Sequence, residues 1–129
     1  MNNTNVKRIK TNKRKLFRYW LEFLKPYHKL AHKEIEALSL MLYYRHELSR
    51  EVLNEELVDN ILFSQSTRLQ IMKDLGGMSN KVFNNLLTSL RKKKVLSKDN
   101  KILPSLIPMM DKNSSNFRLI FNFELDETE

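Results

Sequence analysis

The chain has 129 residues, of which 41% are hydrophobic and 29% are charged, with a net charge of +8 and no cysteine. This length and composition predict one globular domain with an N-terminal extension, and the lack of cysteine excludes disulfides, thiolate metal sites and cysteine nucleophiles. No apolar run reaches the roughly 18 residues that would span a bilayer, and the N-terminus lacks a signal-peptide pattern, so we expect a cytoplasmic protein.

The positive charge is concentrated in two blocks. Residues 1–25 carry eight basic residues and one acidic residue, and residues 64–103 carry nine basic and two acidic residues. The other two stretches have an excess of acidic residues. Residues 26–63 carry four basic and seven acidic residues, and residues 104–129 carry two basic and five acidic residues. Such clustering is typical of a surface that binds a polyanion, although a merely solvated basic face is the alternative.

The N-terminal basic block divides into an arm and a helix. Residues 1–13 lack apolar periodicity and predict a flexible basic arm, whereas residues 14–26 predict a basic amphipathic helix that ends at Pro26. The apolar face of this helix would pack on the core or complete a homo-oligomer, which we favour over a membrane surface. The cations expected to contact nucleic acid here are Lys7, Arg8, Lys10, Lys13 and Arg14.

Four more helices are expected in the middle of the chain. The apolar spacing predicts helices over 32–48 and, in an acidic stretch, over 51–63. Ser66 or Thr67 can cap a further helix, which would extend to about Leu75 and end at the Gly76-Gly77 pair, which supplies left-handed turn conformations. Ser79 is placed to cap the next helix, which extends to about Lys94. Two helices joined by a tight glycine turn make a helix-turn-helix.

The C-terminal part predicts a small antiparallel hairpin. Residues 95–97 and 102–103 are expected to form short strands, and Pro104 and Pro108 limit the following segment to an edge strand or a loop. After the polar turn at 111–116, residues 117–125 alternate between apolar and polar side chains, which predicts a half-buried strand. Residues 126–129 form an acidic tail. The expected fold class is therefore mainly α with a small β-hairpin (α+β), with the globular domain at 30–125.

The helix at 79–94 has a polar face suited to nucleic acid. Its apolar residues fall in one arc, and the opposite arc has asparagine, threonine and cationic side chains without a carboxylate. Asparagine can pair with adenine in the major groove, while lysine and arginine contact guanine or phosphate. The alternative is an ordinary polar surface. The candidate residues are Ser79, Asn80, Lys81, Asn84, Asn85, Thr88, Arg91, Lys92 and Lys94.

The segment SNKVFNNLLTSLRKKKVLS at 79–97 resembles the recognition helix and first wing strand of winged helix-turn-helix proteins, including the MarR-like type. The stretch LAHKEIEALSLML at 30–42 resembles the first core helix of such domains, and residues 117–125 resemble the return strand of the wing. The resemblance covers about residues 30–125 and implies a winged DNA-binding fold. Chains of this size also resemble uncharacterised winged-helix proteins encoded by phages of gut bacteria.

Nothing in the sequence indicates an enzyme or a cofactor site. His28, His32 and Glu36 are spaced so that they could share a helix face as metal ligands, but surface or partly buried histidines are the favoured interpretation. There is no glycine-rich phosphate loop and no HExxH motif. We therefore expect no catalytic residue, no cofactor, no metal and no small-molecule substrate.

Two functions remain open. The first is a double-stranded DNA-binding regulator, with the helix at 79–94 in the major groove and the arm on the backbone; a replication initiator would differ mainly in its target. The second is a structural or interaction protein, such as a phage virion component, that docks on proteins through its domain and contacts packaged nucleic acid through its arm. The expected location is correspondingly the host cytoplasm or the virion.

Overall fold

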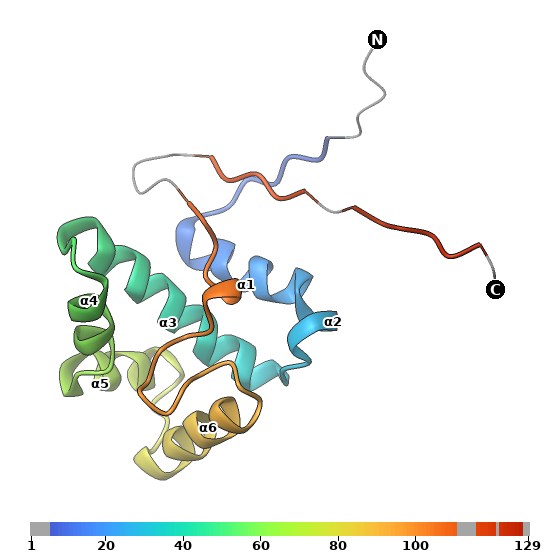
Figure 1. Ribbon diagram of the computed structural model, residues 1–129. Helices are drawn as coiled ribbons and strands as arrows, with labels where there is room; N and C mark the ends of the chain where they lie inside the picture. The colour runs from blue at the N-terminus through green and yellow to red at the C-terminus, as the bar shows by residue number, and fades with distance from the viewer. Residues whose placement is uncertain (1–5, 111–115, 121, 128–129) are drawn as a thin grey trace.

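The computed structural model describes residues 6–110, 116–120 and 122–127. Within them the chain forms six α-helices and one 3-10 helix, arranged around a long central helix (Figure 1). The elements are α1 (Lys13–Phe23), α2 (Lys25–His28), α3 (His32–Glu51), α4 (Glu55–Leu62), α5 (Gln65–Asp74), α6 (Asn80–Lys92) and η1 (Pro104–Leu106).

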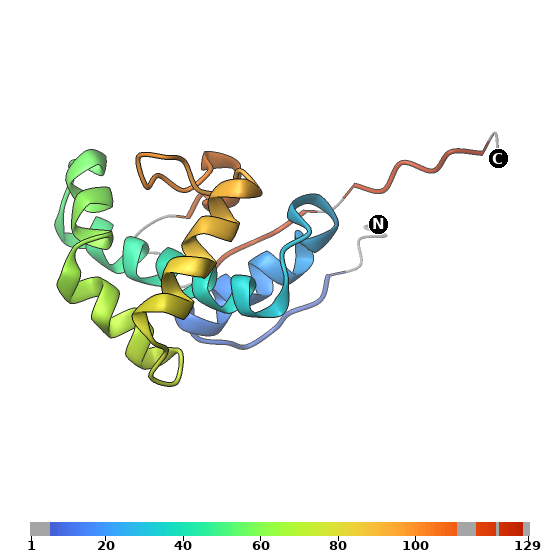
Figure 2. The same ribbon diagram turned by 90° about the horizontal axis from the view of Figure 1, so that it is seen from below.

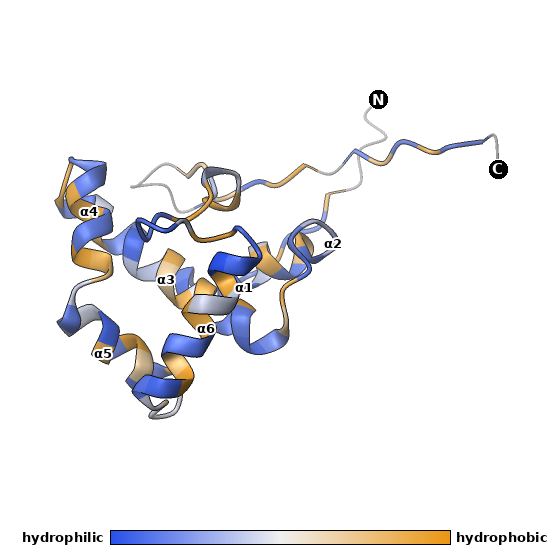
Figure 3. Cartoon of the chain, turned by 60° about the horizontal axis from the view of Figure 1, so that its bottom comes forward, coloured by the Kyte–Doolittle hydropathy of each residue, from blue (hydrophilic) through white to orange (hydrophobic). Residues whose placement is uncertain are grey.

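Helix α3 is the centre of the core. Helices α1, α4, α5 and α6 all contact it, and α1 and α2 lie on the other side of the body from α4 and α5 (Figure 1). The first half of α3 is buried almost all round, whereas α1, α4, α5 and α6 bury one face, so that apolar and hydrophilic stretches alternate along them (Figure 3). The fully buried core side chains include Phe17, Leu21, Ile35, Leu38, Met41, Leu42, Leu62, Ile71 and Leu90.

Local capping interactions explain where the helices begin and end. The Asn12 side chain accepts a hydrogen bond from the Lys15 amide at the start of α1 (2.9 Å), and Ser79 Oγ accepts one from the Val82 amide at the start of α6 (3.3 Å). Both glycines of the turn between α5 and α6 are left-handed, with φ of 84° and 80°. The predicted Ser79 cap and the glycine turn are therefore confirmed, whereas the predicted cap at Ser66 or Thr67 is wrong, because Ser64 is the N-cap of α5 and the helix begins at Gln65.

The predicted hairpin is wrong. Val95–Leu103 forms a loop in which a single antiparallel bridge joins Leu96 to Ile102, supported by backbone hydrogen bonds from Ser97 N to Lys101 O (2.8 Å) and from Leu103 N to Val95 O (2.9 Å). The next residue, Pro104, has no amide to extend the pairing and begins η1. The described residues contain no strand, so the α+β winged fold is corrected to an all-helical one.

The predicted strand at 117–125 is also wrong. Phe117 contacts Trp20 of α1, and beyond this contact the described residues leave the helical body (Figure 2), with the Ile120 and Leu125 side chains 82% and 83% exposed. In the part of the chain that the structure describes, no strand lies beside this segment to pair with it. Phe121, most of the predicted turn at 111–116 and the end of the acidic tail lie outside the described residues. None of the described helices combines the length and apolar character that crossing a membrane requires.

Candidate nucleic-acid interface

Helix α6 separates its side chains into a buried and an exposed face. Phe83, Leu87 and Leu90 are buried in the core. On the other side, the predicted residues Lys81, Asn85 and Lys92 are exposed. The sequence of α6 contains no carboxylate. Of the other predicted residues, Ser79, Asn80, Asn84, Thr88 and Lys94 are exposed and Arg91 is half-buried.

Arg68 of α5 lies against this exposed face. Its guanidinium donates a hydrogen bond to Asn84 Oδ1 and a longer one, of 3.5 Å, to Asn80 Oδ1, and it lies 4.8 Å from the centre of the Phe83 ring. The side-chain amide oxygen of Asn84 therefore already accepts a hydrogen bond within the protein. Asn85 is better placed to form two hydrogen bonds with one base. Sequence reasoning missed Arg68 because it precedes the glycine turn, on a different helix.

The basic run at the end of α6 divides into anchored and exposed cations. Arg91 donates a hydrogen bond to Asn100 Oδ1 in the following loop, and Lys93 forms an ion pair with Glu34. Lys92 and Lys94 are exposed, and within the described part of the chain neither forms an ion pair. Only part of the run is thus available to a polyanion.

Glu34 is a buried carboxylate that joins α3 to α6. It accepts hydrogen bonds from Lys93 Nζ (2.6 Å), from Ser89 Oγ (2.6 Å) and from the backbone amide of Ala31, the N-cap residue of α3 (2.8 Å). Burial by itself would raise the pKa of Glu34, but the hydrogen bonds from Lys93, Ser89 and Ala31 outweigh it and lower the pKa below the ordinary 4.5. The charged form therefore fixes the C-terminal end of α6 against the core.

The cations of the predicted arm also divide in two. Lys7, Arg8 and Lys10 are exposed, in a segment without secondary structure that leads into α1. Lys13 belongs to α1 and lies 4.0 Å from Glu47, and Arg14 forms an ion pair with Asp74 at 3.4 Å. We therefore expect the first three, rather than the last two, to be available for phosphate contacts.

Asp74 is the acceptor of a polar cluster at the end of α5. Tyr44 donates its hydroxyl hydrogen to one carboxylate oxygen, and Gln70 donates to the other at 3.0 Å. Burial and the hydrogen bond to Asp74 raise the pKa of Tyr44 to about 12. Together with Arg14, this cluster ties α1 and α3 to the helix that precedes the glycine turn.

The apolar face of α1 packs mainly within the protein. Phe17 and Leu21 are buried in the core that α1 shares with α3, and Trp20 Nε1 donates a hydrogen bond to Leu106 O at 2.8 Å. Tyr19 and Phe23 remain 40% and 47% exposed. Association of two copies through this helix stays a prediction.

The histidines lie in structural contacts. His28 bonds the Leu21 carbonyl oxygen through Nε2 (2.7 Å) and accepts from the Leu30 amide through Nδ1 (2.9 Å). His32 lies 2.9 Å from Glu36. Among the described residues, no group of three or more histidine, aspartate or glutamate side chains is placed to hold a metal ion.

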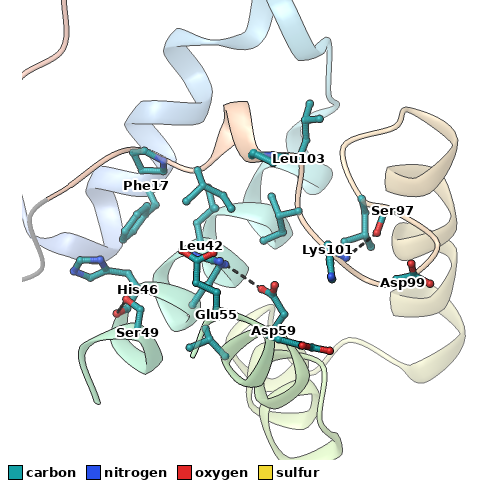
Figure 4. Close-up of a pocket in the computed structure, with 18 of the residues that line it drawn as sticks. Phe17, Leu42, His46, Ser49, Glu55, Asp59, Ser97, Asp99, Lys101 and Leu103 are labelled. Carbon is teal, nitrogen blue, oxygen red and sulfur yellow. Dashed lines mark hydrogen bonds and ion pairs between the residues drawn. The ribbon is translucent and has the colours of Figure 1, made fainter. Parts of the chain in front are cut away.

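A wide groove of about 1740 Å³ lies beside the end of α6. One wall comes from α4 and the end of α3, the other from the loop at 96–104, and the segment at 107–110 lies along it. Figure 4 shows Glu55 and Asp59 on the α4 wall, Lys101 and Asp99 on the loop wall, and Leu42 between them. Lys98 and Lys101 of the loop line the groove together with Lys92 and Lys94. The sequence did not indicate Lys98 and Lys101 as site residues, because they were expected only in the turn between two short strands.

No family model, no curated protein and no solved structure matches the chain. The function is therefore inferred from the surface itself.

Proposed function

We propose that the protein binds double-stranded DNA in a sequence-dependent way, as a regulator of the DNA that it contacts. Helix α6 would lie in the major groove, which is wide enough for one α-helix, with Asn85 and Lys81 facing base edges. Lys92, Lys94 and the arm cations Lys7, Arg8 and Lys10 would contact phosphates.

The observation that carries this proposal is the exposed face of α6. Its exposed side chains include Lys81, Asn85 and Lys92, and with no carboxylate anywhere on the helix, nothing on it repels phosphate. A helix that follows a tight glycine turn and buries its opposite face against a preceding helix is also the usual way of presenting side chains to the major groove.

The test compares two double variants of the full chain on duplex DNA selected from a random pool. Lys81→Ala/Asn85→Ala removes one cation and one amide from the α6 face. The matched control, Lys33→Ala/Asn60→Ala, removes the same two side-chain types from exposed positions of α3 and α4. We expect the first variant to lose preference for the selected site by about tenfold or more, and the control to bind as the wild type does.

A salt series measures the contribution of the arm. Log affinity should fall linearly with log salt concentration, and the slope should decrease by about 0.9 for each phosphate contact removed. The triple variant Lys7→Ala/Arg8→Ala/Lys10→Ala should therefore have a flatter slope and an unchanged site preference. Equal site preference in the wild type and Lys81→Ala/Asn85→Ala would exclude α6 as the helix that contacts bases.

A second candidate function is favoured by the apolar surface. Leu53 and Met109, on the two sides of the groove, are 88% and 97% exposed, which is typical of a surface that contacts another protein. A structural or interaction protein that uses its arm on packaged nucleic acid would show arm-dependent, sequence-independent binding, and the same two assays would distinguish it.

A further inference from the structure

The groove differs from a nucleic-acid surface in its charge. Its loop wall carries Lys98 and Lys101, but its α4 wall carries Glu55 and Glu56, which would repel phosphate. Asp59, on the same wall, is paired with Arg45 at 3.1 Å. The groove thus has a basic side and an acidic side, and its occupant should have both signs of charge.

The groove is also apolar and large. Its lining includes the apolar Leu42 of α3, Val58 of the α4 wall and Ile102 of the loop wall, while Leu53 and Met109 line it with most of their side-chain surface exposed to solvent. Its volume of about 1740 Å³ exceeds the range of about 300–1,000 Å³ that suits small ligands. An extended peptide with apolar side chains fits these properties better than a metabolite does.

The C-terminal segment of the chain has the complementary composition. Between 118 and 127 it carries Arg118, then the apolar Phe123 and Leu125, and the carboxylates Glu124 and Glu127. Phe123 and Leu125 are 82% and 83% exposed, a costly arrangement for side chains of this size. In an extended segment Phe123 and Leu125 point to one side and Arg118 and Glu124 to the other, so the apolar side chains can lie on the floor of the groove while the long charged ones reach its walls.

The segment does not enter the groove of its own chain. Its first part is held at α1, where the Phe117 ring meets the Trp20 ring edge-on with centroids 5.9 Å apart. From there it leaves the body on the side opposite α4, which forms one wall of the groove (Figure 2).

We propose that the groove binds the C-terminal segment, residues 118–127, of a second copy of this chain. The carboxylates of the segment would face Lys98 and Lys101, Arg118 would face the glutamates of α4, and Phe123 and Leu125 would cover the apolar floor. Reciprocal exchange of two segments gives a closed dimer with two identical contacts. The groove shares Lys92 and Lys94 with the phosphate contacts proposed for DNA, whereas Lys81 and Asn85, proposed to face base edges, are not among the residues that line it.

Charge reversal in full-length chains tests whether the groove binds the C-terminal segment, and whether that segment comes from a second copy of the chain. One variant, Lys98→Glu/Lys101→Glu, reverses the loop wall, and a second, Glu124→Lys/Glu127→Lys, reverses the segment. All four side chains are exposed, so neither change is expected to disturb the core. A control, Lys33→Glu/Lys73→Glu, makes the same charge change at exposed positions outside the groove.

Sedimentation velocity over a concentration series is the measurement. We expect the wild type and the control to dimerise. For each reversed variant we expect the dissociation constant of the dimer to rise by about tenfold or more. An equimolar mixture of the two reversed variants should recover the dimer, because each groove then meets a segment of opposite charge. A version of the segment variant that also carries Phe123→Ser/Leu125→Ser should not recover it.

Three results would overturn the proposal. The wild type could stay monomeric at all concentrations, which would leave the groove to another occupant or to its own segment. The reversed variants could dimerise as well as the wild type, which would place the interface elsewhere. Finally, the mixture could stay monomeric while each variant alone has lost its dimer, which would exclude charge pairing between groove and segment.

Discussion

The substitution Glu34→Gln tests whether the buried carboxylate fixes α6 on α3. Oε1 of Glu34 accepts from both the Ala31 amide and Lys93 Nζ, and Oε2 accepts from Ser89 Oγ at 2.6 Å. Glutamine has nearly the same shape and keeps one oxygen for Ala31 and Lys93, but it is neutral and turns an NH2 group toward Ser89, so that Lys93 loses its charged acceptor. A hydrogen bond to a charged group contributes about 1.5–3 kcal/mol. Because the Lys93 side chain is 39% exposed and water can solvate it in the variant, we expect a loss of about 2 kcal/mol in the free energy of unfolding.

Urea unfolding followed by circular dichroism measures this loss, and thermal unfolding should show a decrease in Tm of about 8 °C. The control is Glu36→Gln on the same helix. Glu36 pairs with His32 at 2.9 Å and with Arg18 at 3.6 Å, but its side chain is 35% exposed, so the expected loss is below about 1 kcal/mol.

The pH dependence provides a second check with a definite sign. The pKa of Glu34 is lower in the folded protein than the ordinary value of 4.5, so its charge stabilises the fold fully above that value. This stabilisation is lost as the pH falls through the folded pKa. The difference between wild type and Glu34→Gln should therefore shrink in acid. A difference that is absent near neutral pH, or that persists unchanged in acid, would refute the role assigned to this carboxylate.

Three further changes test the core, the polar cluster and the turn. Leu38 is completely buried, and Leu38→Ala should cost about 2–5 kcal/mol in chemical unfolding; a loss below about 1 kcal/mol would contradict its central place. Because the pKa of Tyr44 is raised to about 12, a spectrophotometric titration should show one of the four tyrosines ionising last. Tyr44→Phe should remove that step, and the stability that the phenol contributes should be lost as the pH rises through about 12; four phenols titrating together would contradict this. Gly76→Ala and Gly77→Ala should each lower stability by about 1 kcal/mol through backbone strain alone, because no atom lies within 4 Å of either added Cβ. An unchanged Tm would show that the turn relaxes.

The helices could be predicted because short-range rules decide them. The apolar spacing, the Ser79 cap and the glycine pair act within a few residues of each position, so the boundaries of the predicted helices agree to within a few residues. The short helix α2 was not predicted, because Pro26 was expected to end the first helix and instead lies in the first turn of α2. The strands could not be predicted in this way, because a strand requires a partner strand that the local sequence pattern does not specify. Leu96 and Ile102 form one bridge, and the alternating segment after 116 meets no sheet.

The candidate site was predictable as a face but not as a set of available side chains. Helical periodicity correctly placed Lys81 and Asn85 outside the core. It could not show that Arg68 bonds Asn84, since that contact depends on how α5 crosses α6. The same limit applies to Lys93, whose carboxylate partner lies 59 residues away in the sequence.

The contact between α1 and the segment after α6 also makes the protein its own spectroscopic probe. Trp20 is the only tryptophan of the chain, and its indole bonds Leu106, 86 residues away, while its ring meets that of Phe117. All of the tryptophan fluorescence therefore arises where the N-terminal helix meets the C-terminal part of the chain. Any event that shifts the C-terminal segment should change this emission without a label.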